Sequence, residues 1–234
     1  RVCLYKGDWQ NALAAAQAVI EKHGALEDLT TSKVLPNYYK SVESIVALEQ
    51  VMTSSYVRIG APNKALIDKY RTGDKRKSLF YKAITASAYT LQKYGEKGND
   101  GYRCSFRSAE AYLIAAEAAA ELAADNAAAD DSKLNEARTY LKELMVKRYA
   151  SAKYNQYAAQ LDNMQKADLL KAIFNERAYE LAFEGHRWFD LRRTTRPELT
   201  KTYDDKTYTL SENDSRYTMR FPIEAVEANP NIEK

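Results

Sequence analysis

The sequence contains little cysteine, glycine or proline. Its two cysteines, Cys3 and Cys104, are too few for a disulfide framework or a zinc site, although they could form one bridge. With only 8 Gly and 5 Pro among 234 residues, the composition favours a helical chain that is long enough for a substantial core. No apolar run approaches the roughly 20 residues that a membrane-spanning helix needs.

An excess of one charge is also missing. Lys and Arg total 35 and Asp and Glu total 32, which gives a net charge of +3. This balance offers no electrostatic case for nucleic acid or an anionic membrane as a partner.

The opening residues RVCLYKGDW lack an initiator Met, a signal peptide and a lipobox. Because Val2, Leu4 and Tyr5 are typical of the tail of a helix, we expect a fragment from the C-terminal part of a longer protein.

Amphipathic helical segments recur along the chain. Asp8 is expected to cap a helix that ends at Gly24 and carries its apolar residues on one face. A second unit is an alanine-rich helix followed by a partner helix, together covering residues 105–149. A third unit covers about 166–194. Small residues at helix contacts are typical of tetratricopeptide repeats, so the pattern predicts a solenoid-like bundle of helical pairs.

Other segments are less regular. Residues 44–52 are compatible with a strand or a buried helix, because periodicity does not separate the two in so short a run. A short helix is expected to end near Thr72 and to be followed by a turn at Gly73. Two β-prone runs around residues 211–215 predict a hairpin, and the tail over 222–234 is expected to be irregular.

The densest group of charges lies in residues 175–193, NERAYELAFEGHRWFDLRR. In a helix, Glu176, Glu180 and Glu184 fall on one stripe, which Gly185 would end before a second short helix over about 186–194. Aromatic rings between the two helices would partly bury three charged residues: Glu184, Arg187 and Asp190. Buried charges need partners, so the segment predicts a structural ion-pair network.

The same residues could instead form an active site, with Glu180, Glu184, His186 and Asp190 as metal ligands or acid and base groups. Helical di-metal sites use Glu-x-x-His, whereas here Glu184 and His186 are two residues apart across a glycine, and no HExxH motif is present. A hydrolase with paired carboxylates stays open, because their separation in space is not readable from sequence. We favour the structural interpretation and assign no catalytic residue, metal ligand or cofactor.

Segment 175–193 closely resembles the C-terminal signature of the SusD/RagB family. Three further segments are similar to family segments and occur in the family's order: GDKR at 73–76, FRSAEAYLIAAEA at 106–118 and FPIEAVEANPN at 221–231. The chain departs from the family in lacking the amino-terminal portion with a signal peptide and a lipid-bearing cysteine. It also has Ile223 and Glu224 where many relatives show a second proline.

The resemblance implies a mainly α fold with tetratricopeptide-like helical pairs, irregular loops and a small C-terminal β-hairpin. It implies the C-terminal portion of one domain: a helical repeat end (1–24), a loop-rich insertion (25–104), two helical pairs with the signature (105–195), and a hairpin and tail (196–234). The implied function is non-catalytic binding of oligosaccharide or polysaccharide by a surface-exposed lipoprotein of the outer membrane. The protein would deliver its cargo to a TonB-dependent, SusC-type transporter and contact the membrane only through a lipid anchor outside this fragment.

Family members bind sugar with aromatic rings and polar side chains on loops. Pyranose rings present C–H groups that pack on aromatic faces, and this chain has 18 Tyr. The candidates on predicted loops are Tyr38, Tyr39, Tyr56 and Tyr81, although for any one of them we favour packing in the core or on the surface. Two other functions stay open: a repeat scaffold that binds a protein on a concave helical face, and a glycoside hydrolase with a Glu/Asp pair.

Overall fold

The computed structural model describes residues 1–47, 61–95, 105–219, 221–229 and 231. It divides into two compact units, Arg1–Glu184 and Gly185–Lys234, each described by itself. The expected division of a single domain at residues 24, 104 and 195 stays a prediction. None of the helices over the described residues combines the length and the hydropathy that a membrane-spanning segment requires.

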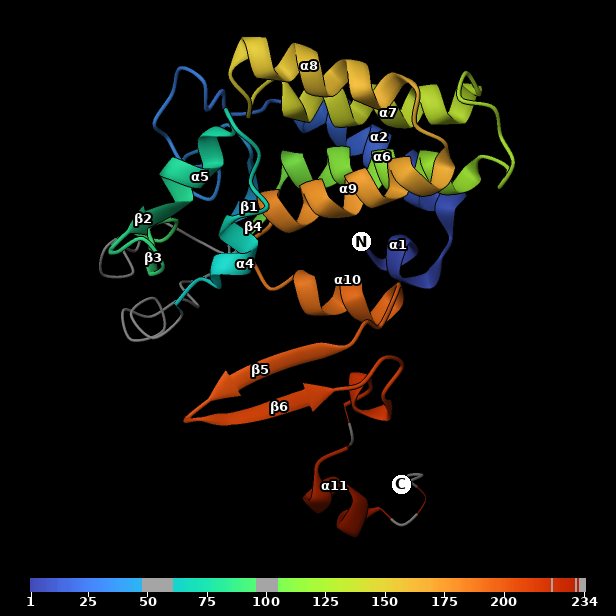
Figure 1. The fold of residues 1–234 in the computed structure, drawn as a ribbon. Helices are drawn as coiled ribbons and strands as arrows, with labels where there is room; N and C mark the ends of the chain where they lie inside the picture. Colours follow the sequence, from blue (N-terminus) through green and yellow to red (C-terminus); the bar gives the residue numbers. More distant parts are fainter. Residues whose placement is uncertain (48–60, 96–104, 220, 230, 232–234) are drawn as a thin grey trace. The chain divides into compact units, whose positions relative to one another are not determined.

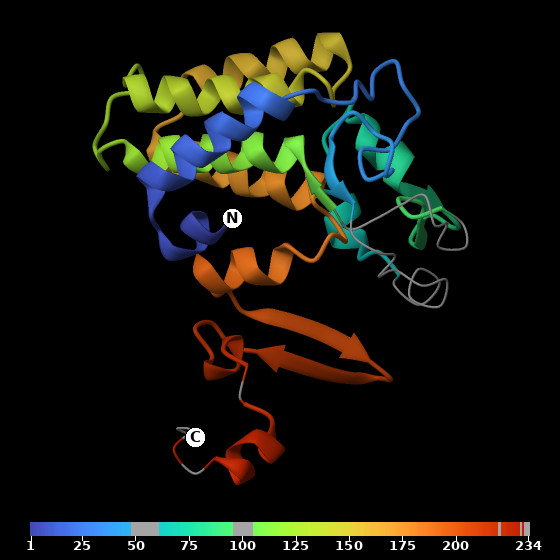
Figure 2. The ribbon, with the colours of Figure 1, turned by 180° about the vertical axis from the view of Figure 1, so that it is seen from behind.

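The first unit is built around one central helix, α6, which packs against three others (Figure 1). Figure 2, which views the structure from behind, shows α2 lying along α6. The helices of this bundle are α1 (Val2–Lys6), α2 (Trp9–His23), α6 (Ser108–Leu122), α7 (Ser132–Met145), α8 (Ser151–Asp162) and α9 (Lys166–Glu180). Because neighbours surround α6, nearly all its residues are buried, and its alanines allow the other helices to approach closely.

The helix boundaries follow capping residues that the sequence offers. Asp8 accepts a hydrogen bond from the backbone N–H of Asn11 at 3.3 Å, and Gly24 follows the last residue of α2, as predicted. Asp131 caps α7 by accepting from the backbone N–H groups of Lys133 and Leu134. The mainly α fold with helical pairs is therefore confirmed. The helix α8 was not predicted, because its apolar face is weak.

Short strands and helices make up the part of the first unit that lies between α2 and α6 in sequence. Strand β1 pairs with β4, and β2 pairs with β3, both antiparallel. These elements are β1 (Ser44–Ala47), α4 (Lys64–Ile67), α5 (Lys75–Phe80), β2 (Tyr81–Ala83), β3 (Tyr89–Leu91) and β4 (Ser105–Arg107). Residues 44–47 take the strand alternative, and 48–52 lie outside the described residues. The predicted turn at Gly73 is confirmed by its φ of 85°, but α4 ends at Ile67 rather than near Thr72.

The second unit contains the C-terminal hairpin. Its elements are α10 (Arg187–Arg193), β5 (Leu199–Tyr203), β6 (Lys206–Leu210), the 3-10 turn η1 (Ser215–Tyr217) and α11 (Ile223–Ala228). The indole of Trp188 stacks on the ring of Tyr217 with centroids 5.1 Å apart. The Tyr217 hydroxyl donates a hydrogen bond to the carbonyl of Pro197. The predicted short helix after Gly185 is confirmed as α10.

Two predictions for this unit were wrong in detail. The hairpin turns at Asp204 and Asp205, with φ of 49° and 57°, and not at residues 211–215. Aspartate tolerates positive φ, and threonines pair across β5 and β6, so this register is favoured. The tail is not wholly irregular, because α11 begins after Pro222, whose fixed φ suits the start of a helix.

Candidate functional site

The glutamates of α9 belong to a buried group of opposite charges that we call the ion-pair cluster. Its side chains come from separate segments of the first unit and all are buried. Its members are Glu43, Asp74, Arg76, Lys93, Arg107, Arg148, Glu176, Glu180 and Glu184. The cluster ties α9 to α5, to β4, to the residue before β1, and to the segments that follow β3 and α7.

Glu180 lies at the centre of the ion-pair cluster. Its Oε1 accepts from Arg107 Nη1 at 2.6 Å and from Arg148 Nη2 at 2.9 Å. Its Oε2 accepts from Arg148 Nε and Arg76 Nη1, both at 2.9 Å. Burial alone would raise the pKa of Glu180, but Arg148 and Arg107 outweigh it and hold the pKa well below its ordinary value. Glu180 is therefore a structural anion that stays ionised at neutral pH.

Glu184 reaches the same cluster from a turn and not from a helix. The prediction that the helix continues to Gly185 was wrong, since α9 ends at Glu180 and Phe183 takes a φ of 63°. The carbonyls at this helix end accept from cations: Lys93 Nζ donates to the carbonyls of Glu180 and Ala182 at 2.9 and 3.0 Å. Cations are favourable at a helix C-terminus, where backbone carbonyls lack helical partners. The buried ammonium thus satisfies two backbone carbonyls at the end of the helix.

The Glu184 carboxylate is itself saturated with cationic donors. It accepts from Lys93 Nζ at 2.5 Å and from Arg107 Nη2 and Nε at 2.8 and 3.0 Å. Burial opposes ionisation, but Arg107 and Lys93 outweigh it and lower the pKa of Glu184 to about 2.

The predicted burial of Glu184 and Asp190 is confirmed, whereas Arg187 is exposed, contrary to expectation.

Glu176 differs from the other carboxyl groups of the cluster. Its Oε1 lies 2.6 Å from Arg76 Nη2, and its Oε2 accepts from the Tyr149 hydroxyl at 3.1 Å. Burial raises the pKa of Glu176 more than Arg76 lowers it. The ion-pair cluster holds five carboxyl groups and four cations, so one retained proton balances its charge. Glu176 is the member best suited to carry that proton.

The ion-pair cluster does not have the properties of an active site. Glu180 and Glu184 already accept hydrogen bonds from buried cations, which leaves them no capacity to exchange protons with a substrate. Among the described residues, no group of three or more His, Cys, Asp and Glu side chains is placed to hold a metal ion. The structural interpretation of these glutamates is supported by their partners.

Three of the four tyrosines that the sequence suggested lie within the described residues. Tyr38 and Tyr39 are neighbours on the loop before β1, with ring centroids 5.1 Å apart in an edge-to-face arrangement. Tyr39 is 43% exposed, and the Lys40 ammonium lies 5.3 Å from its ring centroid. Tyr81 is not on a loop: it begins β2 and its side chain is 3% exposed. Tyr56 lies outside the described residues.

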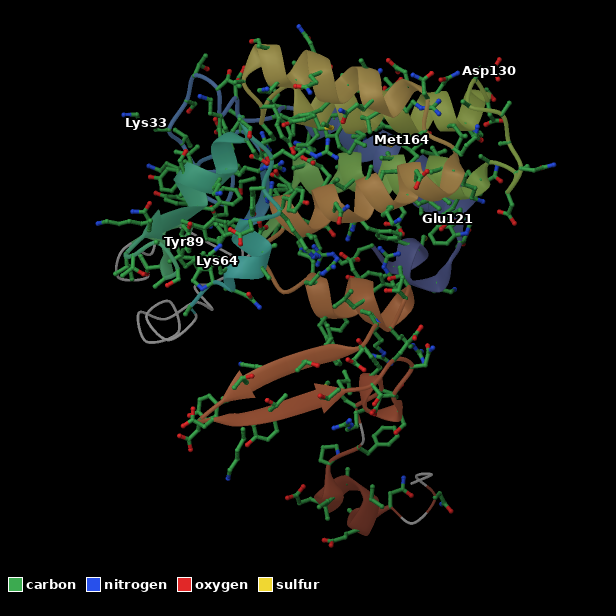
Figure 3. The ribbon with its side chains drawn as sticks, viewed as in Figure 1. Lys33, Lys64, Tyr89, Glu121, Asp130 and Met164 are labelled. Carbon is green, nitrogen blue, oxygen red and sulfur yellow. The ribbon has the colours of Figure 1, made fainter. Side chains whose placement is uncertain are left out.

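Tyr81 is part of the wall of an open cleft of about 640 Å³, which we call the tyrosine cleft. The cleft lies between the turn before α5, α5 itself and the β2–β3 hairpin. Its lining includes Tyr70, Arg71, Lys77, Tyr81, Tyr89 and Gln92. Figure 3 labels Tyr89 on β3 and Lys64 on α4, which lie close together on this side of the first unit. The cleft brings together aromatic rings, cations and an amide, none of which except Tyr81 the sequence had singled out.

Hydrogen bonds hold the wall of the tyrosine cleft rigid. The Tyr70 hydroxyl donates to the Tyr179 carbonyl at 2.8 Å and lies 3.1 Å from the Tyr81 hydroxyl. Burial raises the pKa of Tyr81 to about 12, so this phenol stays protonated at neutral pH. The Arg71 guanidinium lies over the Tyr157 ring, 4.7 Å from its centroid. Tyr70 lies just before the GDKR turn in sequence, which is the signal that could have indicated it, whereas the β2–β3 hairpin brings Tyr89 to the cleft.

Comparison with known proteins identifies the family and the fold of this chain. The family model of the SusD family matches residues 15–233. A SusD superfamily protein from Bacteroides fragilis is similar in structure, with a TM-score of 0.69 and 24% identity over 100% of this chain and 54% of its own. A SusD-like carbohydrate binding protein from Bacteroides vulgatus aligns with a TM-score of 0.64 and 21% identity, over 99% of this chain and 57% of its own. A SusD superfamily protein from Parabacteroides distasonis aligns with a TM-score of 0.63 and 15% identity, over 97% of this chain and 56% of its own.

The chain spans little more than half the length of these solved structures. A search of curated proteins gave no match. The family model nevertheless covers nearly the whole chain, and the resemblance seen in the signature at 175–193 is confirmed. The chain belongs to the SusD family.

Proposed function

We propose that this chain is part of a protein that binds oligosaccharide or polysaccharide without cleaving it. The observation that carries the proposal is the tyrosine cleft, where the partly exposed ring of Tyr89 lies beside Gln92 and three cations, and the buried rings of Tyr70 and Tyr81 form part of the wall. Aromatic faces pack on the C–H groups of a pyranose ring, and amide and phenol groups match its hydroxyls. The related structure described as a SusD-like carbohydrate binding protein supports the same ligand class.

The cleft offers no pair of carboxylates for glycoside hydrolysis. Among its described lining residues Asp74 is the single carboxylate, and its oxygens accept three hydrogen bonds from Arg76 at 2.7 to 3.0 Å. Most glycoside hydrolases need two carboxyl groups, one to protonate the leaving oxygen and one to act as nucleophile or base. The proposal is therefore one of binding without turnover.

The neighbouring Tyr38 and Tyr39 are a second platform in the proposal. Tyr39 is 43% exposed, so part of its side chain is accessible to a sugar. The full protein would act at the surface of the outer membrane as a lipid-anchored protein and deliver saccharide to a TonB-dependent, SusC-type transporter. Deleting the gene in the source bacterium should then abolish uptake of the bound saccharide by intact cells.

A glycan array with the full-length protein tests the binding proposal, followed by titration calorimetry with the saccharides that bind. Removing a contacting ring, as in Tyr39→Ala or Tyr89→Ala, should weaken binding roughly twofold to tenfold, the range expected for one aromatic contact. The matched control is Tyr208→Ala, an exposed tyrosine on β6. Equal affinities for all three variants and the wild type would place the binding site elsewhere, and an array without any bound glycan would overturn the proposal.

A further inference from the structure

Two cations in the tyrosine cleft, Arg71 and Lys77, have no carboxylate partner among the residues that the structure describes. Arg71 and Lys77 line the cleft and are half-buried, and neither forms an ion pair with any residue that the structure describes. The acidic groups nearby are already paired: Asp68 with Lys64 at 2.5 Å, and Asp74 with Arg76 at 2.7 Å. The charges of Arg71 and Lys77 are therefore not neutralised by any residue that the structure describes.

This arrangement contrasts with the ion-pair cluster, whose buried cations are all matched by carboxylates. Each half-buried cation has lost part of its hydration without gaining an anionic partner. Asp74, the single lining carboxylate among the described residues, is bound to Arg76. A cleft lined by one sign of charge concentrates ligands of the opposite sign.

The guanidinium of Arg71 is also held in place. It stacks over the Tyr157 ring, and the Tyr157 hydroxyl in turn donates to the Thr72 carbonyl at 3.2 Å. A guanidinium fixed by stacking loses little side-chain entropy when it binds, and its parallel N–H groups match the two oxygens of a carboxylate or a sulfate. Lys77 supplies a compact ammonium from α5 to the same cleft.

We propose that the tyrosine cleft selects saccharides that carry an anionic group, either a uronate carboxylate or a sulfate ester. Arg71 and Lys77 donate hydrogen bonds to that group, while the ring of Tyr89 packs on a neighbouring pyranose. A neutral saccharide would leave both cations without a partner, which is why the anionic ligand is preferred. This inference rests on the proposed saccharide binding and adds the charge class of the ligand.

The test is titration calorimetry of the full-length protein with three probes of similar length. These are an oligogalacturonate, a sulfated chondroitin oligosaccharide and a neutral cello-oligosaccharide. We expect one of the two anionic probes to bind about tenfold tighter than the neutral one. Raising the ionic strength from about 0.1 M to about 1 M shortens the screening length from about 10 Å to about 3 Å, and should weaken the anionic complex alone.

Substitutions of Arg71 and Lys77 test whether these two side chains cause the preference for the anionic saccharide. Lys77→Gln and Arg71→Gln should each weaken the anionic complex about fivefold to tenfold, whereas Arg71→Lys keeps the charge and should lose less. The matched control is Lys33→Gln, which makes the same charge change at an exposed loop position outside the cleft lining (Figure 3). Thermal unfolding of each variant confirms that it is folded before its affinity is compared.

The outcomes separate this inference from the proposed function. The inference is supported if an anionic probe binds tightly and its binding is weakened by Lys77→Gln and Arg71→Gln but not by Lys33→Gln. Binding of the neutral probe as tightly as both anionic probes overturns the charge selection and leaves saccharide binding intact. If the cleft variants and the control change the affinity for the anionic probe equally, the location of the site in the tyrosine cleft is overturned. No binding of any saccharide, here or on an array, overturns the proposed function together with the inference.

Discussion

The substitution Glu184→Gln isolates the contribution of the ion-pair cluster to stability. The Glu184 carboxylate accepts from Lys93 Nζ at 2.5 Å and from Arg107 Nη2 at 2.8 Å, and all three side chains are buried. Glutamine keeps the shape of the side chain but removes its charge, which leaves two buried cations short of a partner. Breaking a buried ion pair in this way costs about 3–5 kcal/mol.

The pKa of Glu184 gives a second, independent magnitude. Burial raises it, but Arg107 and Lys93 outweigh burial and lower the pKa from an ordinary 4.5 to about 2. At about 1.4 kcal/mol per pKa unit, this difference corresponds to about 3 kcal/mol. A lowered carboxyl pKa stabilises the fold fully above the unfolded-state pKa, and the stabilisation is lost as the pH falls toward the folded-state pKa. The wild type should therefore lose this contribution between about pH 5 and pH 2, and Glu184→Gln should not.

Urea unfolding of the full-length protein at neutral pH, followed by circular dichroism, measures the loss. The control is Glu136→Gln, because Glu136 pairs with Lys133 at 2.7 Å in a partly exposed position. That change should cost below about 1 kcal/mol. A Glu184→Gln protein whose free energy of unfolding lies within about 1 kcal/mol of the wild type would refute the reasoning about this cluster.

Two further predictions concern stability. Glu176→Gln should cost less than about 1 kcal/mol, because burial raises the pKa of Glu176 and the amide resembles its protonated form. The wild type should also lose stability as the pH rises above the unfolded-state pKa of this group, a slope that the variant removes; a cost as large as that of Glu184→Gln would contradict the assignment of the proton. Gly185→Ala should cost about 1–2 kcal/mol from its φ of 82° alone, since no atom lies within 4 Å of the added Cβ. Gly73→Ala should cost more in the same unfolding assay, because its Cβ would also lie 2.8 Å from Lys153 Cγ; equal costs would exclude this steric contribution.

The charge pattern of α9 was sufficient to predict that its glutamates are paired, but not with which residues. Burial next to an apolar seam requires partners for Glu180 and Glu184, and that requirement is readable from sequence. The partners Arg76, Arg107 and Arg148 come from other segments, the first of them 104 residues away from Glu180. Such pairings depend on the completed fold and leave no local trace.

Local signals explain the errors in secondary structure. In α8 only Leu161 is buried, so the apolar periodicity that marks the other helices is missing there. The strand β2 is three residues long, which is too short for alternation to distinguish it from a loop, and Tyr81 was misplaced for that reason. Tyr70 and Tyr89 join Tyr81 in the tyrosine cleft only because α5 and the β2–β3 hairpin bring them together.

We propose that the signature charges hold the fold, while saccharide binds elsewhere and is not cleaved. Product analysis of the bound oligosaccharide, after incubation with the wild type and with folded Glu184→Gln protein, tests this proposal. We expect intact oligosaccharide in both samples and equal affinity for it. Cleavage by the wild type that disappears in a well-folded Glu184→Gln protein would show instead that a signature glutamate acts in catalysis.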